Sequence, residues 1–352
     1  MIAHKKVIFF LPPALGGAER MTVNIAKMLD RERYEVVFCI VGRGEHKISA
    51  FIPDTCRTIT LPVRSIADFF TIRLTRLLKK ESADIVFCSQ MAYHPALIVA
   101  AKLCRAKVVI RNNFSMAGHS KILRMLYRLT YRYADVVIAQ QDEMRDEILS
   151  LPHMDPEKVI TLHNPVDTEL IDEKLACAAS PYAGDTVNYV SVGSIQYRKG
   201  QDTLLKAFSE VCKRIEDSHL YFVGGLLEPE FGQSLNRYIS ENGLEKCVHF
   251  TGMQSNPYPW MKFADCFVLA SRNEGLPNVL IDASYLGTPA VAVRCIPVIE
   301  RIISDGENGY VVQPEDVSGM AEAMLKALSL RDCRMTFKTA SKDDFRRIFD
   351  TL

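Results

Sequence analysis

Long apolar runs are missing from this sequence. No stretch of the 352-residue chain reaches the roughly 18 consecutive apolar residues that a membrane-spanning helix needs. The ten cysteines include no C-x-x-C pair, and most of them lie in apolar runs such as residues 37–39. This pattern predicts buried thiols in a reducing compartment and disfavours a disulfide framework or a zinc site. We therefore expect a cytoplasmic protein without a membrane span.

The G-x-G-x-x-G fingerprint and the Walker A sequence are also absent. Without them, a dinucleotide-dependent dehydrogenase and a P-loop nucleotidase lose their main support. Low-complexity segments and repeats of solenoid period are missing too. The apolar run at residues 7–11 is broken by Pro12 and Pro13, so a first β-strand explains it better than a secretory signal does.

Charge is balanced overall but unevenly distributed. The chain carries 43 Lys+Arg and 42 Asp+Glu, a formal net charge of +1. Residues 1–163 hold 24 basic and 16 acidic residues, a balance of +8, whereas the remaining residues hold 19 and 26, a balance of −7. Two halves of opposite sign suggest two domains with different partners, and the length suits about two domains.

Short apolar runs alternate with amphipathic stretches along the whole chain, which predicts parallel sheets covered on both faces. The predicted strands are 6–11, 35–41, 84–88, 107–110, 135–139, 159–163, 187–192, 219–223, 248–251, 266–270, 290–293 and 310–312. The predicted helices are 18–30, 65–80, 95–104, 119–133, 142–150, 201–215, 230–242, 257–263, 278–286, 297–304 and 316–328. The predicted fold class is α/β, with two Rossmann-like domains that face each other across a cleft.

The domain boundary is predicted in a polar, small-residue stretch that follows Asn164 and Pro165. We predict an N-terminal domain at residues 1–165, a linker at 166–186, a second domain at 187–335, and a C-terminal helix within 336–352. This last helix is expected to pack back toward the N-terminal domain.

Two loops after predicted strands have the composition of anion sites. Ligands of doubly wound sheets bind beyond the carboxyl ends of the strands. Gly16 and Gly17 stand at a strand-to-helix junction, where backbone N–H groups and a helix N-terminus favour an anion. Arg198 and Lys199 precede Gly200 at another helix start, a charge arrangement that suits a diphosphate. Taken alone, either loop is also explained as an ordinary turn.

A third loop, residues 271–278, joins a buried-looking strand to a helix. Its helix-start amides are suited to phosphate oxygens. Glu274 before the helix and Asp282 on it are suited to accept hydrogen bonds from sugar hydroxyls, because carboxylates are natural acceptors for paired hydroxyls. Either acid alone is also explained as a helix cap or a surface charge.

Together, these motifs resemble those of the family 4 glycosyltransferases, which are retaining enzymes of the GT-B fold, and of bacterial surface-polysaccharide enzymes in particular. The resemblance covers nearly the whole chain and is strongest over residues 187–325. It rests on the segments 16–20, 193–200, 274–278 with the acid at 282, and 305–309.

The resemblance implies that a nucleotide-sugar donor is held mainly by the second domain, with the acceptor bound by the first. Lys199 would bind the diphosphate of the leaving nucleotide, Glu274 the hydroxyls of the donor sugar, and Asp282 the ribose. The family needs no metal, because cations and helix dipoles stabilise the departing diphosphate. The implied donor is a UDP-sugar, and no cofactor is expected.

The remaining donor contacts implied by the resemblance come mainly from the backbone. Amides around Gly275, Leu276 and Asn278 would contact the phosphate and the sugar. Gly16 and Gly17 would close over the donor from the first domain.

The sequence departs from the family pattern at several positions. The family usually has Glu where this chain has Asp282, and often Arg where it has Ser194, whose missing charge Arg198 is expected to supply. The histidine that often follows a first-domain strand is replaced within residues 111–113. Asn112 and His119 are therefore the candidates for its catalytic role.

The first half carries a basic helix. Residues 85–134 contain eight Lys/Arg and no Asp or Glu, and Lys121, Arg124, Arg128 and Arg132 recur at helical spacing. A basic amphipathic helix suits an anionic membrane surface, although the solvated side of a core helix has the same pattern. Nucleic acid is not expected, because the chain is not basic overall and shows no binding module.

We predict a metal-independent retaining glycosyltransferase that acts on a lipid-linked or surface-glycan acceptor in polysaccharide biosynthesis, such as that of lipopolysaccharide or capsule. It would work in the cytoplasm, peripherally on the inner face of the cell membrane. Two alternatives stay open. A GT-B nucleotide-sugar epimerase would need no acceptor, and a non-catalytic sugar-nucleotide-binding protein is suggested by Ser194 and Asp282.

Overall fold

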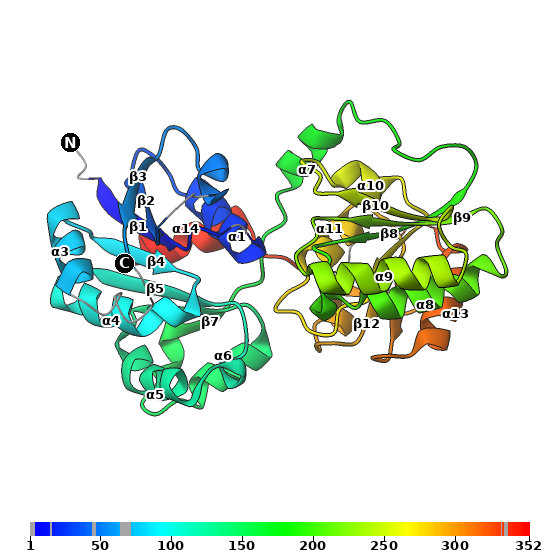
Figure 1. The fold of residues 1–352 in the computed structure, drawn as a ribbon. Helices are drawn as coiled ribbons and strands as arrows, with labels where there is room; N and C mark the ends of the chain where they lie inside the picture. Colours follow the sequence, from blue (N-terminus) through cyan, green and yellow to red (C-terminus); the bar gives the residue numbers. More distant parts are fainter. Residues whose placement is uncertain (1–3, 15, 44–46, 64–71, 332, 334–336) are drawn as a thin grey trace. The chain divides into compact units, whose positions relative to one another are not determined.

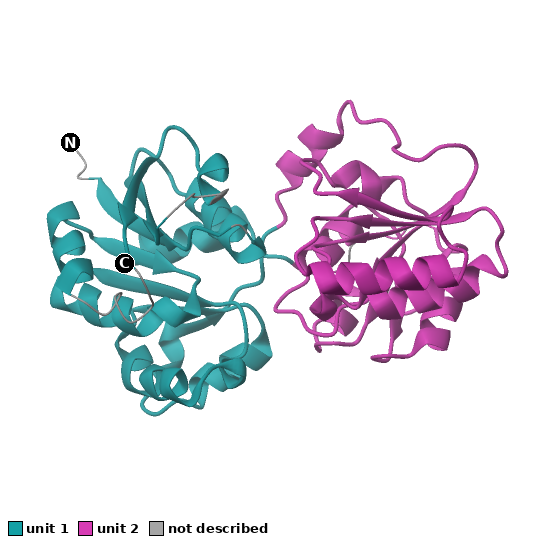
Figure 2. Ribbon diagram, in the orientation of Figure 1, with its two compact units in different colours: residues 1–165, 339–352 teal, residues 166–338 magenta. Residues whose placement is uncertain are grey.

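The computed structural model describes residues 4–14, 16–43, 47–63, 72–331, 333 and 337–352. The chain forms two compact units (Figure 2). Unit 1 comprises residues 1–165 and 339–352, and unit 2 comprises residues 166–338.

Unit 1 is built on a seven-stranded parallel sheet in the order β3-β2-β1-β4-β5-β6-β7 (Figure 1). Its strands are β1 (Lys5–Leu11), β2 (Tyr34–Val41), β3 (Arg57–Leu61), β4 (Ile85–Cys88), β5 (Lys107–Asn112), β6 (Val136–Ala139) and β7 (Val159–Thr161). Its helices are α1 (Gly17–Lys27), α3 (Ile72–Glu81), α4 (His94–Leu103), α5 (Lys121–Thr130), α6 (Asp142–Leu149) and α14 (Lys342–Asp350).

The central strand β1 shows why this sheet is covered on both sides. Its residues from Val7 to Leu11 are all buried, and alternate side chains enter different cores. Ile8 and Phe10 pack in one hydrophobic cluster, whereas Val7, Phe9 and Leu11 pack in the other. Side chains of a strand alternate between its two faces, so a continuous apolar run requires cover on each face.

Unit 2 repeats the arrangement with a six-stranded parallel sheet in the order β10-β9-β8-β11-β12-β13. Its strands are β8 (Val187–Val192), β9 (Ser218–Val223), β10 (Val248–Gly252), β11 (Cys266–Leu269), β12 (Ala290–Val293) and β13 (Gly309–Val312). Its helices are α7 (Thr168–Leu175), α8 (Gln201–Cys212), α9 (Pro229–Glu241), α10 (Tyr258–Lys262), α11 (Asn278–Tyr285), α12 (Ile299–Ile302) and α13 (Val317–Ala327).

The structure differs from the sequence prediction at β3 and in the predicted linker. Strand β3 was not predicted, because four of its five residues are not fully buried and it has no continuous apolar run. The segment predicted as a linker contains α7, which Asp167 caps and which buries Ile171 in unit 2. Of the predicted helix 65–80, residues 65–71 lie outside the described residues, and α3 begins at Ile72.

The C-terminal helix α14 belongs to unit 1 although it follows unit 2 in the sequence. Its capping box pairs Ser341 with Asp344. Phe349 lies 6.0 Å from the ring of Phe9 and 6.1 Å from that of Phe87, between ring centroids. These apolar contacts make α14 part of the core of unit 1.

Both sheets reverse their strand order between the first and the fourth strand of the unit. In unit 1 this point lies between β1 and β4, and in unit 2 it lies between β8 and β11. Ligands of doubly wound sheets bind beyond the carboxyl ends of strands at such a point. We therefore expect each unit to bind its ligand at the loops after these strands.

Candidate functional site

In unit 2, two loops meet at the point where the strand order reverses. The loop of residues 193–200 follows β8, and the loop of residues 271–277 follows β11, which pairs directly with β8. A backbone hydrogen bond joins the two loops: the Arg272 N–H donates to the Arg198 carbonyl at 2.9 Å. The Arg198 guanidinium in turn donates to the Asn273 carbonyl at 2.8 Å. The two loops therefore form one structure.

Gly200 allows this close approach. It adopts a left-handed conformation with φ of 67°, at the start of α8. A Cβ atom at this position would lie 2.0 Å from the carbonyl oxygen of Ala270, at the end of β11. Any other residue would push the loop away from β11, so Gly200 is required for its position as well as for its conformation.

Glu274 is the centre of a charged cluster. Its carboxylate is buried and accepts a hydrogen bond from Lys199 Nζ at 2.6 Å and one from Ser271 Oγ at 2.7 Å, both at Oε1. Arg198 Nη1 lies 3.3 Å from Oε2. Two cations thus converge on one carboxylate, and four lone-pair sites for three donors leave it able to accept a further hydroxyl.

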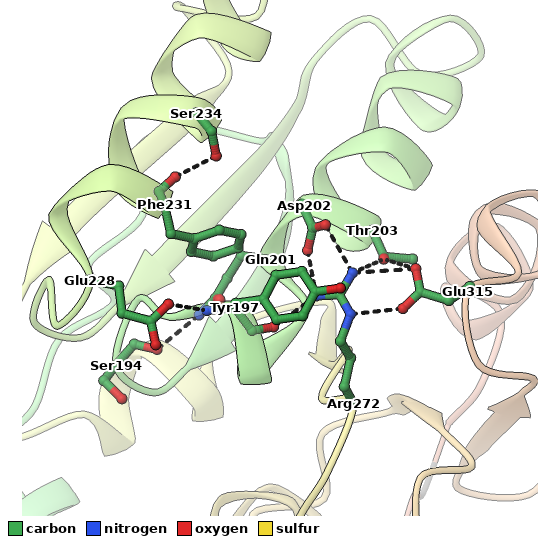
Figure 3. Close-up of polar contacts among 10 residues, drawn as sticks. All are labelled: Ser194, Tyr197, Gln201, Asp202, Thr203, Glu228, Phe231, Ser234, Arg272 and Glu315. Atoms are coloured by element: carbon green, nitrogen blue, oxygen red, sulfur yellow. Dashed lines mark hydrogen bonds and ion pairs between the residues drawn. The ribbon is translucent and has the colours of Figure 1, made fainter.

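Arg272 fixes the loop after β11 to α8 and to the turn at Tyr197 (Figure 3). It forms a two-pronged ion pair with Asp202 at 2.7 and 2.8 Å, and its Nε contacts Glu315 at 2.8 Å. It also donates to the Tyr197 carbonyl at 2.7 Å, and its guanidinium lies 4.0 Å from the centre of the Tyr197 ring. The hydrogen bonds that Arg272 donates to Asp202 raise the pKa of Arg272, so this side chain stays positively charged.

Tyr197 is held from a second direction by residues at the start of α9. Its N–H donates to Glu228 Oε2 at 2.9 Å, and its ring meets that of Phe231 edge-on at 5.9 Å. Figure 3 shows the Tyr197 ring with Arg272 on one side and Phe231 on the other. The turn that carries Arg198 and Lys199 is thereby fixed before any ligand binds.

The remaining predicted residues of unit 2 lie along the same loops and on α11. Ser194 Oγ accepts from the Gln196 side chain at 2.6 Å, within the β8 loop. Gly275 and Leu276 are buried, and the Leu276 side chain packs in the hydrophobic core, so any ligand contact of Leu276 falls to its backbone. Asn278 is the first residue of α11.

Asp282 lies one turn further along α11 and is partly buried. Burial raises its pKa to about 7, and the neighbouring Asp167 carboxylate contributes in the same direction. The acid predicted to contact a ribose is therefore easily protonated near neutral pH. A protonated carboxyl donates one hydrogen bond as well as accepting others.

In unit 1, the predicted glycine pair starts α1. Gly16 is the N-cap residue, with an extended backbone, and Gly17 is the first helical residue. The Glu19 carboxylate folds back onto this end, where the backbone N–H groups of Glu19 and Gly16 bond to it. Burial raises the pKa of Glu19 despite these bonds. The Gly16 amide, one of the two that the sequence assigned to a ligand, thus holds the carboxylate of its own helix.

Asn112 and His119 belong to a partly buried network of neutral polar groups. The Tyr131 hydroxyl lies 3.1 Å from Asn112 Oδ1 and 2.8 Å from Nδ1 of the buried His94. His119 Nδ1 lies 2.7 Å from the Tyr127 hydroxyl. Burial lowers the pKa of His119 and lowers that of His94 to about 3. Asn112 is 1 % exposed, whereas His119 is partly accessible.

The residue before Asn112 is a buried cation. Arg111 is fully buried and donates to Asn164 Oδ1. Burial lowers the pKa of Arg111 to about 9. Because Asn164 stands immediately before Pro165, the last residue of the first segment of unit 1, Arg111 fixes the chain where it leaves that unit.

Comparisons with known proteins agree with this geometry. The family model for glycosyl transferases of group 1 matches residues 186–330, which cover the unit 2 site. The model for glycosyltransferase family 4 matches residues 15–170. The lipopolysaccharide core biosynthesis glycosyltransferase LpsE of Rhizobium meliloti is 31% identical over 320 residues, which are 88% of this chain and 84% of that protein. This chain belongs to glycosyltransferase family 4.

Other relatives match this glycosyltransferase along nearly its full length. One is the N-acetylgalactosamine-N,N'-diacetylbacillosaminyl-diphospho-undecaprenol 4-alpha-N-acetylgalactosaminyltransferase of Campylobacter jejuni, which is 24% identical and matches over 96% of this chain and 94% of that protein. Among solved structures, Anabaena HepE in complex with UDP and glucose has a TM-score of 0.77 at 18% identity, with 99% of each chain covered. This likeness shows that the glycosyltransferase has the GT-B fold.

Sequence reasoning missed several residues of the glycosyltransferase site. Ser271 donates to the predicted Glu274, whereas Arg272 and Glu228 hold Tyr197, the residue before the predicted Arg198. The positions of Arg272 and Glu228 are far from Tyr197 in the sequence. The adjacency of Arg272 to the Glu274 motif was the available signal. Nothing in the sequence marked His94.

Two features are absent among the residues that the structure describes. No helix in this part of the chain is long and apolar enough to cross a membrane. No group of three or more His, Cys, Asp or Glu side chains there is arranged to hold a metal ion.

Proposed function

We propose that this glycosyltransferase transfers a sugar, with retention of configuration, from a UDP-sugar to a lipid-linked or surface-glycan acceptor in polysaccharide biosynthesis. The main support for a donor site in unit 2 is that Lys199 and Arg198 both contact Glu274, close to the start of α11. HepE of Anabaena, which has the same fold, binds UDP and glucose, and the Campylobacter relative acts on a diphospho-undecaprenol acceptor.

Lys199 and Arg198 are the groups we assign to the leaving diphosphate. As the bond between the sugar C1 and the phosphate oxygen breaks, negative charge builds on the diphosphate. Fixed cations and helix-start amides stabilise this charge without reorganising during the reaction. Arg272 donates a hydrogen bond to the Tyr197 carbonyl, and the Tyr197 N–H donates one to Glu228; these two bonds keep the two cations in place. We propose that these groups suffice and that no metal ion is needed, so transfer should persist in EDTA.

Glu274 is the group we assign to the donor sugar. Its carboxylate accepts bonds from Lys199 and Ser271 and retains acceptor capacity for a sugar hydroxyl. Backbone amides around Gly275, Leu276 and Asn278 would hold the phosphate and the sugar, Ser194 would contact the diphosphate, and Asp282 would contact the ribose.

Unit 1 is the part that we assign to the acceptor. Gly16 and Gly17 would supply backbone contacts to the donor, after Glu19 releases the Gly16 amide. Of the two predicted catalytic groups, His119 is partly accessible in the structure, whereas Asn112 is in place to orient Tyr131.

A membrane surface is the partner that we propose for α5. Lys121, Arg124 and Arg128 are exposed on this helix, and Arg132 follows in the next turn. Each cation near an anionic leaflet adds about 1 kcal/mol to binding. We therefore propose a cytoplasmic enzyme that works peripherally at the inner face of the cell membrane.

Substitution of Glu274 tests the donor site. We expect Glu274→Gln to lower the transfer rate by at least about 100-fold, because a charged acceptor that also positions Lys199 is lost. The matched control is Glu322→Gln, which removes an exposed acid of the same unit that pairs with Arg214. Full turnover by folded Glu274→Gln protein would overturn the assignment. Incubation with the donor alone separates transfer from epimerisation, since only an epimerase converts the donor without an acceptor.

A further inference from the structure

A cavity of about 350 Å³ lies on unit 1 between α5, the turn at residues 116–117 and α6. The two helices lie side by side in Figure 1, at the side of unit 1 where β6 and β7 are found. Lys121, Arg124 and Arg128 line the cavity, together with Met125 and Tyr127. The three cations are spaced at i, i+3 and i+7 on one helix face.

The three basic side chains of the cavity are not engaged in ion pairs with the acids that the structure describes. The acid that lines the cavity is Glu147, and its carboxylate is already engaged. It accepts bonds from Ser115 Oγ at 3.0 Å and from the N–H groups of Met116 and Ala117, each at 2.9 Å.

The hydrogen bonds that Glu147 accepts determine which kind of ligand the cavity suits. Its three bonds fix the 116–117 turn as one wall, and buried Tyr127 forms part of another. The other charged side chains of the lining are three cations. They repel one another while the cavity is empty, and they attract an anion. Arg and Lys hydrogen-bond most strongly to phosphate and carboxylate oxygens.

An exposed apolar stripe runs beside the cavity. Ile122, Met125, Leu129 and Tyr133 each follow one of the four basic residues by a single position, and they are 71%, 54%, 52% and 50% exposed. Exposed apolar side chains aligned along one helix differ from the scattered ones that are normal on a protein surface. A ligand that meets both stripes has an anionic group beside an apolar body.

We propose that this cavity binds the phosphate of an anionic phospholipid headgroup, while the stripe of Ile122, Met125, Leu129 and Tyr133 contacts the acyl chains. The proposal rests on the membrane-facing function proposed above and sharpens it, because it names a defined lipid site rather than a diffuse charged surface. It also assigns different tasks to the two stripes of α5.

Vesicle binding by the full chain tests the charge of the site. Vesicles of phosphatidylcholine with phosphatidylglycerol are compared with phosphatidylcholine alone, by co-sedimentation. We expect Arg124→Gln/Arg128→Gln to weaken binding to the anionic vesicles about 30-fold, since two cations are lost. The matched control is Lys79→Gln/Lys80→Gln, two exposed cations on α3 of the same unit, with a change below about twofold. Equal effects of the two double variants would overturn the proposal.

Two further probes distinguish a lipid phosphate site from a carboxylate site and from a site for free anions. Vesicles made anionic with cholesteryl hemisuccinate carry carboxylates instead, and they should bind more weakly than phosphatidylglycerol vesicles of equal surface charge. Equal binding would overturn the phosphate site. Inorganic phosphate should compete with phosphatidylglycerol vesicles at constant ionic strength in the parent protein. Binding of phosphate without any vesicle preference would identify a free-anion site and overturn the lipid assignment.

The apolar stripe and the donor site need separate measurements. Met125→Gln/Leu129→Gln keeps every cation, and it should still lose vesicle binding. Retention of full binding would contradict the role of the stripe. UDP-sugar binding, followed by the shift in melting temperature, should be unchanged in Arg124→Gln/Arg128→Gln. If the parent protein binds no UDP-sugar, the proposed function is contradicted, whereas the conclusion from vesicle binding still holds.

Discussion

Unit 1 and unit 2 reverse their strand order at corresponding strands, yet they place their charged side chains differently. In unit 2, Glu274, Lys199 and Arg198 are joined by ion pairs, and Arg272 braces the loop from outside. In unit 1, the buried polar groups are mostly neutral, and the cations of α5 face outward. A fixed charge cluster suits one small, doubly charged ligand, whereas outward cations suit a large anionic surface.

Removal of the central cation of unit 2 should have the largest effect. We expect Lys199→Met to lower kcat about 100- to 1,000-fold, because a preorganised positive group no longer meets the leaving diphosphate. Lys206→Met removes an exposed lysine from α8 in the same unit and serves as the control. Steady-state rates with a panel of UDP-sugars measure the change. A turnover close to that of the parent protein would mean that the cluster of Lys199, Arg198 and Glu274 only supports the fold. The proposed difference between the ligands of the two units would then be wrong.

Acid should destabilise unit 1 through His94. Burial lowers the pKa of folded His94 to about 3, while the unfolded chain titrates near 6.5, so the unfolded state binds more protons between these values. Stability is therefore lost as pH falls below 6.5, by about 2 kcal/mol at pH 5. Hydrogen exchange in β4 and β5 at pH 5 and pH 8 measures it. His94→Gln should remove this pH dependence, whereas His153→Gln at an exposed position should retain it.

Weakening the brace of unit 2 should lower donor affinity without abolishing chemistry. We expect Arg272→Lys to raise the KM for the donor about tenfold with a smaller change in kcat, because a lysine cannot hold Asp202, Glu315 and the Tyr197 carbonyl together. Arg214→Lys, in an exposed ion pair with Glu322, is the control. An effect on melting temperature alone would show that Arg272 supports the fold and not the position of the donor loop.

The smallest effect is expected at Asp282, where the pH dependence has the opposite sign to that of His94. The folded pKa is raised to about 7, so folded Asp282 is protonated at pH values where the unfolded chain is ionised. Stability of unit 2 therefore falls as pH rises from about 4 to about 7, moderately because the side chain is partly exposed. Hydrogen exchange in α11 should show this slope, and it should flatten in Asp282→Asn but not in Asp185→Asn. A slope that persists in Asp282→Asn would assign it elsewhere.

The strands of this protein could be predicted wherever burial is continuous. The apolar runs of β1 and β11 are visible in the sequence, because both faces of each strand are covered. Edge strand β3 was missed since its side chains are largely exposed, and α7 was missed because its burial rests mainly on Ile171. The pattern of apolar residues in a sequence reflects burial, so helices and strands with few buried residues are hard to predict from it.

The candidate site could be predicted where motifs are contiguous. Lys199 and Glu274 stand in recognisable loops, and their 2.6 Å contact follows from the adjacency of β8 and β11. The brace by Arg272 and the network around His94 depend on partners brought together by tertiary packing. No local propensity marks such residues, and the structure was needed to find them.

The position of α14 has a consequence for how the chain is made. The strands of unit 1 leave the ribosome first, and unit 2 follows in full before residues 339–352 appear. Phe345 and Phe349 of α14 fill the core against Phe9 and Phe87. A nascent chain therefore carries an open apolar surface on unit 1 until α14 has been synthesised. The unit that is begun first is the unit that is finished last.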